Sequence, residues 1–159
     1  MDVWLRSEVA EAQKELVLRE LKDPSKVQPF VYFMKAMESL PKVGGTFLDA
    51  GCGCGHYGYL VDRNFPQWDY YGTDFSPSMI ERAKNVVPLE TIRVCEFLDN
   101  KFGEYDAVLV SGIMEFADDP WDWLDYVVLH TRGYLILHRL RLIKGYSRPV
   151  TEPTYLGLM

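Results

Sequence analysis

Residues 46–58 contain the groups of this chain that are best placed to do chemistry. A short apolar strand ends at the acid Asp49, and a series of glycines follows: Gly51, Gly53, Gly55 and Gly58. Glycine has no Cβ and tolerates positive φ, so such a loop lets backbone N–H groups approach a ligand closely. The carboxyl of Asp49 adds a fixed negative charge at the mouth of the loop. Together they indicate a nucleotide-like ligand that also carries a positive group.

A second acid, Asp74, follows the next apolar stretch, 21 residues after Gly53. An acid at the end of the second strand of a nucleotide-binding unit can accept hydrogen bonds from the ribose hydroxyls. Directly after it, Ser76 and Pro77 form an N-cap and first-turn pair that opens a helix. The ordered set of strand, glycines, helix, strand and acid predicts an adenosine-containing ligand.

Two ligands of that kind compete. Residues 53–58, Gly-Cys-Gly-His-Tyr-Gly, match the dinucleotide pattern G-x-G-x-x-G. A pyrophosphate is anionic, however, and Asp49 beside the loop would repel it. A sulfonium nucleoside with an amino-acid tail is cationic at sulfur and at its amine, so it gains from the same carboxylate. The acid favours the sulfonium ligand and leaves an NAD-binding oxidoreductase as the weaker alternative.

The elements that position these residues follow from apolar periodicity and from proline and glycine breaks. The sequence predicts helices at 3–22, 27–40 and 57–64, helices opening at Ser76-Pro77 and at Asp119-Pro120, and strands at about 46–50, 68–73, 91–97, 105–111 and 134–138. This alternation predicts an α/β fold, a doubly wound and mostly parallel sheet with helices on both faces.

In these motifs the chain resembles the class I S-adenosylmethionine-dependent methyltransferases over roughly residues 43–140. Residues 48–55, Leu-Asp-Ala-Gly-Cys-Gly-Cys-Gly, match the family's first motif, and residues 71–79 are similar to its second. Cys95-Glu96-Phe97 resembles the adenine segment, with Glu where Asp is usual, and residues 105–116 resemble the fourth strand and its exit.

The resemblance implies S-adenosylmethionine as the cofactor. It implies a binding site made of these residues: Asp49, Gly51, Cys52, Gly53, Gly55, Asp74, Phe75, Ser76, Met79, Glu96, Phe97, Ser111 and Gly112.

By the same resemblance, methyl transfer is an in-line displacement to which the protein contributes positioning, desolvation and sometimes a general base. The candidate catalytic bases are Glu115, His138 and His56, and His138 ranks first because it ends the fifth strand on the ligand-facing edge. Phe116 stands where many small-molecule members have a histidine. The fourth strand also lacks the Asp/Asn-Pro-Pro-Tyr sequence typical of transfer to planar nitrogen. A small molecule methylated on oxygen, carbon or aliphatic nitrogen is therefore expected.

Composition narrows the partners. The 159 residues carry a net charge of −6 without a Lys/Arg block, so no nucleic-acid partner is expected. There is no apolar run long enough to span a membrane and no signal-peptide pattern. The odd count of three cysteines indicates reduced thiols and a cytoplasmic protein. The C-x-C-x-H spacing of Cys52, Cys54 and His56 is a poor metal set, so compact filler residues are expected there.

The chain is expected to form one methyltransferase-like domain (1–159), with an N-terminal helical lid (1–42), a cofactor-binding core (43–140) and a short extended tail (141–159). The lid and residues 113–120 are expected to form the acceptor pocket. The family's sheet normally has two further strands, which here are shortened or missing. The chain is then either part of a longer protein or has its sheet edge covered, for which a homodimer is one possibility. The short C-terminus also keeps a non-catalytic binding or partner domain as an alternative function.

Other residues have structural interpretations. The aromatic residues Trp68, Tyr70, Tyr71, Trp121 and Trp123 are expected to pack in or against the core. The charged residues of the first helix, Glu8, Glu11, Lys14, Glu15, Arg19 and Glu20, are expected to form a solvated face.

Overall fold

The computed structural model describes residues 2–87, 91–95, 103–117 and 119–140. Its helices are η1 (Asp2–Leu5), α1 (Ser7–Glu20), η2 (Pro24–Lys26), α2 (Gln28–Glu38), α3 (His56–Asn64), α4 (Pro77–Val86), η3 (Met114–Phe116) and α5 (Pro120–Leu129). Its strands are β1 (Gly45–Ala50), β2 (Trp68–Asp74), β3 (Ile92–Val94), β4 (Tyr105–Ser111) and β5 (Thr131–His138). Within these residues, no helix is long and apolar enough to cross a membrane.

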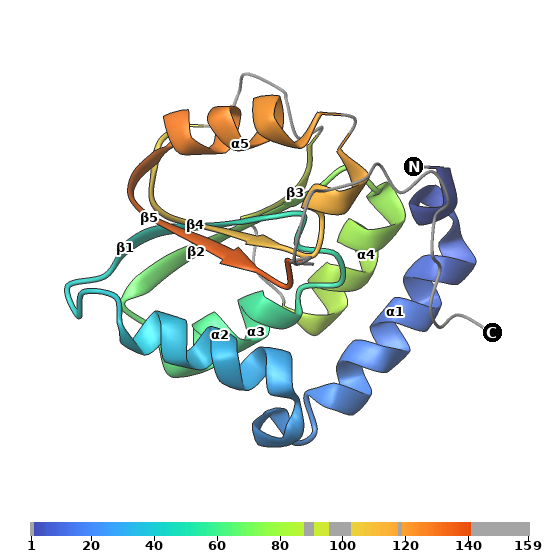
Figure 1. The fold of residues 1–159 in the computed structure, drawn as a ribbon. Helices are drawn as coiled ribbons and strands as arrows, with labels where there is room; N and C mark the ends of the chain where they lie inside the picture. Colours follow the sequence, from blue (N-terminus) through green and yellow to red (C-terminus); the bar gives the residue numbers. More distant parts are fainter. Residues whose placement is uncertain (1, 88–90, 96–102, 118, 141–159) are drawn as a thin grey trace, which may run out of the picture.

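The strands form one parallel sheet in the order β3-β2-β1-β4-β5. Helix α5 covers one face, whereas α2, α3 and α4 lie on the other, with α1 packed beside α4 (Figure 1). The expected α/β fold with helices on both faces is confirmed. Parallel strands need crossover connections, and the helices that supply them bury both faces of the sheet.

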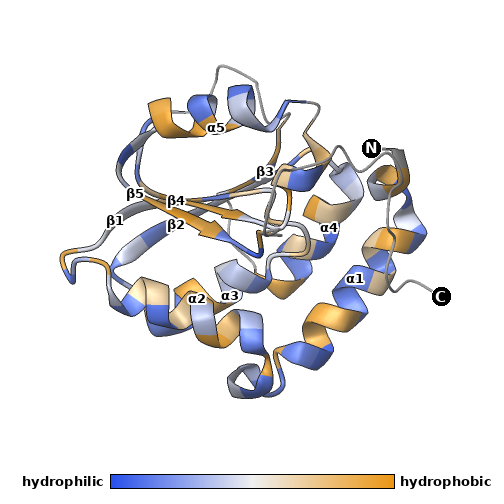
Figure 2. Ribbon diagram, viewed as in Figure 1, coloured by the Kyte–Doolittle hydropathy of each residue, from blue (hydrophilic) through white to orange (hydrophobic). Residues whose placement is uncertain are grey.

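Alternate residues of each central strand feed two separate cores. Phe47 of β1 and Leu109 of β4 belong to the larger core under α2, α3 and α4. Leu48 and Val108 belong to the smaller core under α5. Successive side chains of a strand point to opposite faces, so a strand covered on both sides must be apolar at nearly every position. Figure 2 shows β4 largely in the apolar colour, whereas the colours alternate along α1.

Two helices begin at the expected caps. The hydroxyl of Ser76 accepts the Met79 N–H at 3.3 Å, and Asp119 Oδ1 accepts the N–H groups of Trp121 and Asp122. A side-chain acceptor at this position satisfies donors that the first turn leaves unpaired. The N-cap Ser76 lies two residues after Asp74, the last residue of β2, so α4 begins next to the end of that strand.

Four sequence expectations need correction. Strand β5 begins at Thr131 rather than Tyr134, so Gly133 lies inside it instead of leading it. Trp123 is buried as expected, but Trp121 is 75% exposed and does not pack in the core. Glu11 is not part of a purely solvated face, because it pairs with Arg82 of α4. The third strand was expected over 91–97 and is Ile92–Val94, with residues 96 and 97 outside the described residues.

Candidate ligand site at the carboxyl edge of the sheet

The loop of residues 51–55 lies where a parallel sheet of this kind binds ligands. The chain passes from β1 through α3 to β2 on one side, while β4 lies on the other side of β1. The strand order reverses between β1 and β4, and ligands of open α/β sheets bind outside the carboxyl ends of the strands at such a point. The loop connects the carboxyl end of β1 directly to α3.

The glycines of the loop are required by its backbone. Gly51, Gly53 and Gly55 have φ of +80°, +52° and +82°, in the left-handed region that side chains disfavour. A Cβ on Gly51 would lie 2.6 Å from Ile113, whereas one on Gly53 would meet no atom within 4 Å. The backbone at Gly53 therefore faces open space that a ligand can fill.

Asp74 ties the loop to the end of β2. Its Oδ2 accepts the Gly53 N–H at 3.0 Å and its Oδ1 accepts the Ser76 N–H at 2.9 Å. Burial raises the pKa of this carboxyl, while the two backbone N–H groups of Ser76 and Gly53 oppose the rise. Each carboxylate oxygen has a second lone pair, so the group can also accept hydrogen bonds from a ligand. The two acids and the glycines of the sequence pattern thus meet at one place.

Asp49 lies below the loop rather than at its open mouth. Its side chain is fully buried, and Oδ2 accepts a hydrogen bond from the Tyr70 hydroxyl at 2.8 Å. Its Oδ1 is buried without a hydrogen-bond partner. Burial raises the pKa of Asp49 to about 7, the Tyr70 hydrogen bond opposes this, and the charge of Asp74 adds to it. The carboxyl is thus a buried acid beneath the loop, and a positive charge placed on the loop would favour its ionised form.

Gly58 has a different function from the other glycines. A Cβ there would lie 2.7 Å from the ring of Tyr70. The absence of a side chain lets Tyr70 reach Asp49 under α3. The last glycine of the dinucleotide-like pattern thus serves the packing of Tyr70.

This arrangement fits a cationic nucleoside and does not fit a dinucleotide. Two buried carboxyls, Asp49 and Asp74, flank the loop, and one carboxyl oxygen is unpaired. A pyrophosphate placed on the loop would face both acids, whereas a sulfonium or ammonium group would be attracted to them.

A second cluster lies at the ends of β4 and β5. Ser111 Oγ is 3.0 Å from His138 Nδ1 and 3.1 Å from the Tyr57 hydroxyl, which is itself 3.1 Å from the same nitrogen. Burial lowers the pKa of His138, and Arg139 lowers it further, against a hydrogen bond with the Pro29 backbone. The imidazole is therefore neutral at neutral pH, which is the state that can take a proton.

Tyr57 is a member of this cluster that the sequence interpretation missed. It is almost fully buried in the first turn of α3, and burial raises the pKa of its hydroxyl to about 12. Its position directly after the glycine loop was the available signal, because α3 starts beside the ends of β1 and β4.

The other site residues expected from the sequence do not all join these two clusters. His56 stacks on Phe30 at 5.6 Å, and burial lowers its pKa to about 3, so it is too weak a base for neutral pH. Glu115 is exposed on η3, which follows β4. Gly112 follows Ser111 with φ +66° and donates its N–H to the His138 carbonyl at 3.1 Å. Glu96 and Phe97 lie outside the described residues.

The cysteines are buried packing groups at the loop. Cys52 and Cys54 are 0% and 2% exposed. The Cys54 thiol lies 3.5 Å from the Ala10 carbonyl and 3.6 Å from the Met79 sulfur. Among the residues that the structure describes, no cluster of His, Cys, Asp or Glu could hold a metal ion.

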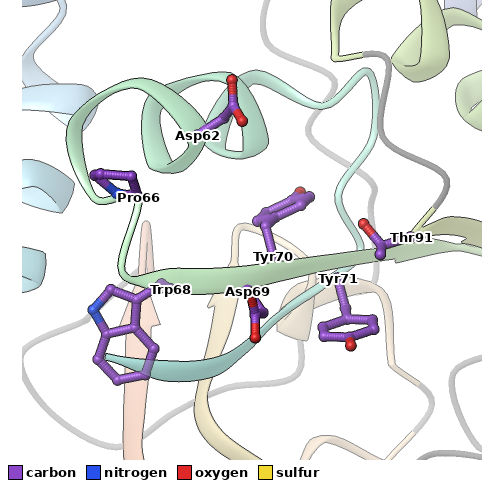
Figure 3. A pocket seen from close by; sticks show the side chains of 7 residues that line it. All are labelled: Asp62, Pro66, Trp68, Asp69, Tyr70, Tyr71 and Thr91. Carbon is purple, nitrogen blue, oxygen red and sulfur yellow. The ribbon is translucent and has the colours of Figure 1, made fainter. Parts of the chain in front are cut away.

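A hollow of about 460 Å³ lies away from this edge (Figure 3). It is lined by Asp62, Pro66, Trp68, Asp69, Tyr70, Tyr71 and Thr91. Trp68 starts β2, so this hollow lies toward the amino end of the strand, whereas Asp74 ends it. It is therefore separate from the ligand site.

Comparison with known proteins agrees with this geometry. Residues 48–132 match the family model of a methyltransferase domain. Malonyl-[acyl-carrier protein] O-methyltransferase of Hahella chejuensis is 31% identical over 99 residues, which cover 58% of this chain and 36% of that protein. The chain thus spans about a third of the length of this relative.

Solved structures share the fold. A TehB-like SAM-dependent methyltransferase from Corynebacterium glutamicum superposes with a TM-score of 0.57 at 24% identity, over 80% of this chain and 72% of that one. Magnesium protoporphyrin IX methyltransferase from Synechocystis, solved with bound SAM, gives a TM-score of 0.57 at 21% identity, over 71% and 56% of the chains.

Proposed function

Because the chain belongs to the methyltransferase domain family, we propose that it is an S-adenosylmethionine-dependent enzyme that methylates a small molecule. The observation that carries the proposal is the pair of buried acids at the glycine loop. Asp74 bridges Gly53 and Ser76, and Asp49 below holds an unpaired oxygen. These groups suit a ligand with ribose hydroxyls and a positive charge.

The cofactor-binding residues in this proposal are those expected from the motifs. Gly51, Gly53 and Gly55 provide close backbone approach, and Asp74 accepts the ribose hydroxyls. The proposed set also includes Phe75, Ser76 and Met79 around the start of α4. Cys52 of the loop, Ser111 at the end of β4 and the adjacent Gly112 complete it. The bound cofactor supplies a methyl group on a sulfonium sulfur, which a nucleophile displaces in line.

The acceptor site is proposed between the N-terminal helices and the segment after β4. Trp4 of η1 contacts Phe116 of η3 with ring centroids 5.6 Å apart, so these two parts lie next to each other. Oxygen, carbon and aliphatic nitrogen all remain candidate acceptors. The O-methyltransferase relative supports testing oxygen acceptors first.

His138 is the proposed general base. Its neutral imidazole can take a proton at Nδ1, and Ser111 Oγ at 3.0 Å provides a path to that nitrogen from the edge of β4. In this path the acceptor gives its proton to Ser111 Oγ while the Ser111 proton moves to His138 Nδ1. Glu115 on η3 is the second candidate.

A calorimetric titration with S-adenosylmethionine, S-adenosylhomocysteine and NAD tests the proposal. We expect both sulfur nucleosides to bind and NAD to give no heat of binding. If neither sulfur nucleoside binds, the proposed function is wrong. NAD binding alone would support an oxidoreductase instead.

A non-catalytic binding or partner domain is the second candidate. Phe116 favours it, because many small-molecule methyltransferases of the class have a histidine at this position. The hydrogen bonds that His138 Nδ1 already makes with Tyr57 and Ser111 also favour it. The two candidates differ in transfer of a labelled methyl group to a panel of small alcohols, carboxylic acids and amines. Tight cofactor binding without transfer to any of them would favour the partner domain. A cytoplasmic location stays a prediction from the reduced cysteines.

A further inference from the structure

The N-terminal segment, defined here as residues 2–20 (η1 and α1), touches three parts of the rim of the ligand site. Trp4 packs edge-on against Phe116, which follows β4. The Ala10 carbonyl accepts from the Cys54 thiol of the glycine loop. On the third side, α1 runs beside α4, the helix that begins just after Asp74 (Figure 1). The segment therefore forms a wall of the site.

Apolar packing of α1 against the rest of the protein is limited. Of its 14 residues, Ala10 and Val17 are buried and Val9 packs partly buried against the core, and its N-cap residue makes no side-chain capping hydrogen bond. Most helical stability in proteins comes from a buried apolar face. Polar contacts must therefore contribute much of what holds α1 in place.

Arg82 provides those contacts from α4. Its Nε donates to Glu11 Oε2 at 3.2 Å and one terminal nitrogen donates to Ser7 Oγ at 2.9 Å. The other terminal nitrogen donates to Glu81 Oε2 at 2.9 Å. The side chain is only 16% exposed. The guanidinium is partly buried and its donors are fixed in a planar fork, so little freedom is lost per bond. Its bonds to Ser7 and Glu11 tie α4 to α1.

The wall also carries an unsatisfied donor. The indole Nε1 of Trp4 is buried and has no hydrogen-bond partner. It lies next to Phe116, at the boundary between the N-terminal segment and the exit of β4. A buried donor without a partner is costly, and a ligand acceptor at this boundary would satisfy it.

We propose that Arg82 is a positioning residue that holds α1 across the cofactor site through Ser7 and Glu11, and thereby slows release of the cofactor. This proposal rests on the proposed function. In this proposal the N-terminal segment, which contacts the site through Trp4 and Ala10, moves away when the cofactor is released. That movement breaks the contacts of Arg82 with α1.

The first test needs no ligand. Hydrogen exchange of the α1 backbone amides is measured in the wild type, in Arg82→Met and in Glu11→Gln. We expect roughly three- to tenfold faster exchange in α1 for both variants, since each loses charge-assisted hydrogen bonds. Lys84→Met is the matched control, because Lys84 is an exposed cation on the same helix. Equal exchange in all four proteins would overturn the proposal.

The second test measures release of S-adenosylmethionine by stopped-flow mixing. The release rate should rise in the order Arg82, Arg82→Lys and Arg82→Met, because lysine keeps a charge pair but cannot reach both Ser7 and Glu11. We expect roughly three- to tenfold faster release for Arg82→Met, and an unchanged rate for Lys84→Met. A wild-type rate in Arg82→Met would overturn the proposal.

The two tests keep this proposal separate from the proposed function. If the wild type does not bind S-adenosylmethionine, the proposed function fails, while hydrogen exchange still reports whether Arg82 holds α1. Circular dichroism would reveal a folding defect of Arg82→Met. In that case the exchange rates of Glu11→Gln decide whether the contact between Arg82 and Glu11 holds α1.

Discussion

At the scale of single residues, Asp74 does two jobs that a neutral substitution can separate. It holds the loop through the N–H groups of Gly53 and Ser76, and in the proposed function it accepts the ribose hydroxyls. Asp74→Asn keeps the shape but presents one acceptor oxygen in place of two. We expect S-adenosylmethionine to bind about 10- to 100-fold more weakly, as for loss of a hydrogen bond to a charged group. Calorimetry measures this.

Asp62→Asn is the control for that substitution. Asp62 is exposed near the end of α3, so its neutralisation removes the same charge from the protein without touching the loop. Its affinity should equal that of the wild type. If Asp74→Asn also keeps wild-type affinity, the ribose assignment is wrong.

Asp49 predicts opposite effects on stability and on binding. Its pKa is about 7 when folded and near 3.8 when unfolded. Between these values the folded chain holds a proton that the unfolded chain has lost, so stability falls as pH rises. Above pH 7 the Asp49 carboxyl is ionised in the folded chain, and burial of this charge then lowers the free energy of unfolding by its full amount. Asp49→Asn should therefore stabilise the cofactor-free chain by about 4 kcal/mol at pH 8 and have little effect near pH 4.

The same substitution should weaken binding of S-adenosylmethionine, because the cation loses its buried counter-charge. In the wild type, affinity should increase as pH rises through about 7. Thermal melts at pH 4 and pH 8 measure the change in stability of Asp49→Asn, and calorimetry at pH 8 measures the change in its affinity for S-adenosylmethionine. An Asp49→Asn protein that is less stable at pH 8 would contradict the assignment of a raised pKa.

At the scale of elements, a substitution in the glycine loop can separate the effect of backbone strain on stability from the effect of a blocked approach on ligand affinity. Gly53→Ala puts a side chain at φ +52° in the open space of the loop. The strained backbone should cost about 1 kcal/mol of stability, whereas affinity for S-adenosylmethionine should fall at least about tenfold because the methyl group blocks close approach. Melting and titration of the same sample separate the two effects.

Alanine substitutions at two further glycines serve as comparisons for Gly53→Ala. Gly51→Ala should lose more stability than Gly53→Ala, since its φ is also positive and its Cβ would lie 2.6 Å from the Ile113 side chain, which must shift. Gly103→Ala is the neutral control, because a Cβ there meets no atom within 4 Å and its φ is not positive. Undiminished affinity in Gly53→Ala would show that the loop backbone does not contact the ligand.

The parts of the fold that the sequence predicts well are those with local signals. The loop after β1 and the caps Ser76 and Asp119 are set by residues within a few positions of each other. The start of β5 is not local, because Thr131 becomes a strand residue by pairing with Tyr105 across a register shift of β4. Trp121 and Trp123 look alike in sequence, yet two positions on a helix face different sides.

The candidate site shows the same limit. The pairs Glu11 with Arg82 and Tyr57 with His138 are 71 and 81 residues apart. No pattern within one segment connects them, since they meet only when the helices pack on the sheet. The cofactor motif could thus be predicted from sequence, whereas the partners of His138 and the anchor of α1 required the packed structure.

At the scale of the whole molecule, the sheet has β5 at one edge. Among the described residues, no strand pairs with the outer side of β5. Its side chains Tyr134 and Leu137 are 43% and 39% exposed. An uncovered edge strand with apolar side chains is a template for pairing with another chain. We predict from this edge, as the described residues form it, that copies of the chain associate along β5.

Light scattering over a range of protein concentrations checks that prediction. We expect a dimer mass for the wild type and a shift toward the monomer for Leu137→Lys, because a charge on the edge opposes strand pairing. Val43→Lys is the control, since Val43 is 91% exposed before β1 and away from this edge. A monomer mass for the wild type at every concentration would mean that β5 does not mediate association. His138, the proposed base, ends the same strand. The pH dependence of methyl transfer, compared between the wild type and Leu137→Lys, would therefore also show whether association affects this histidine.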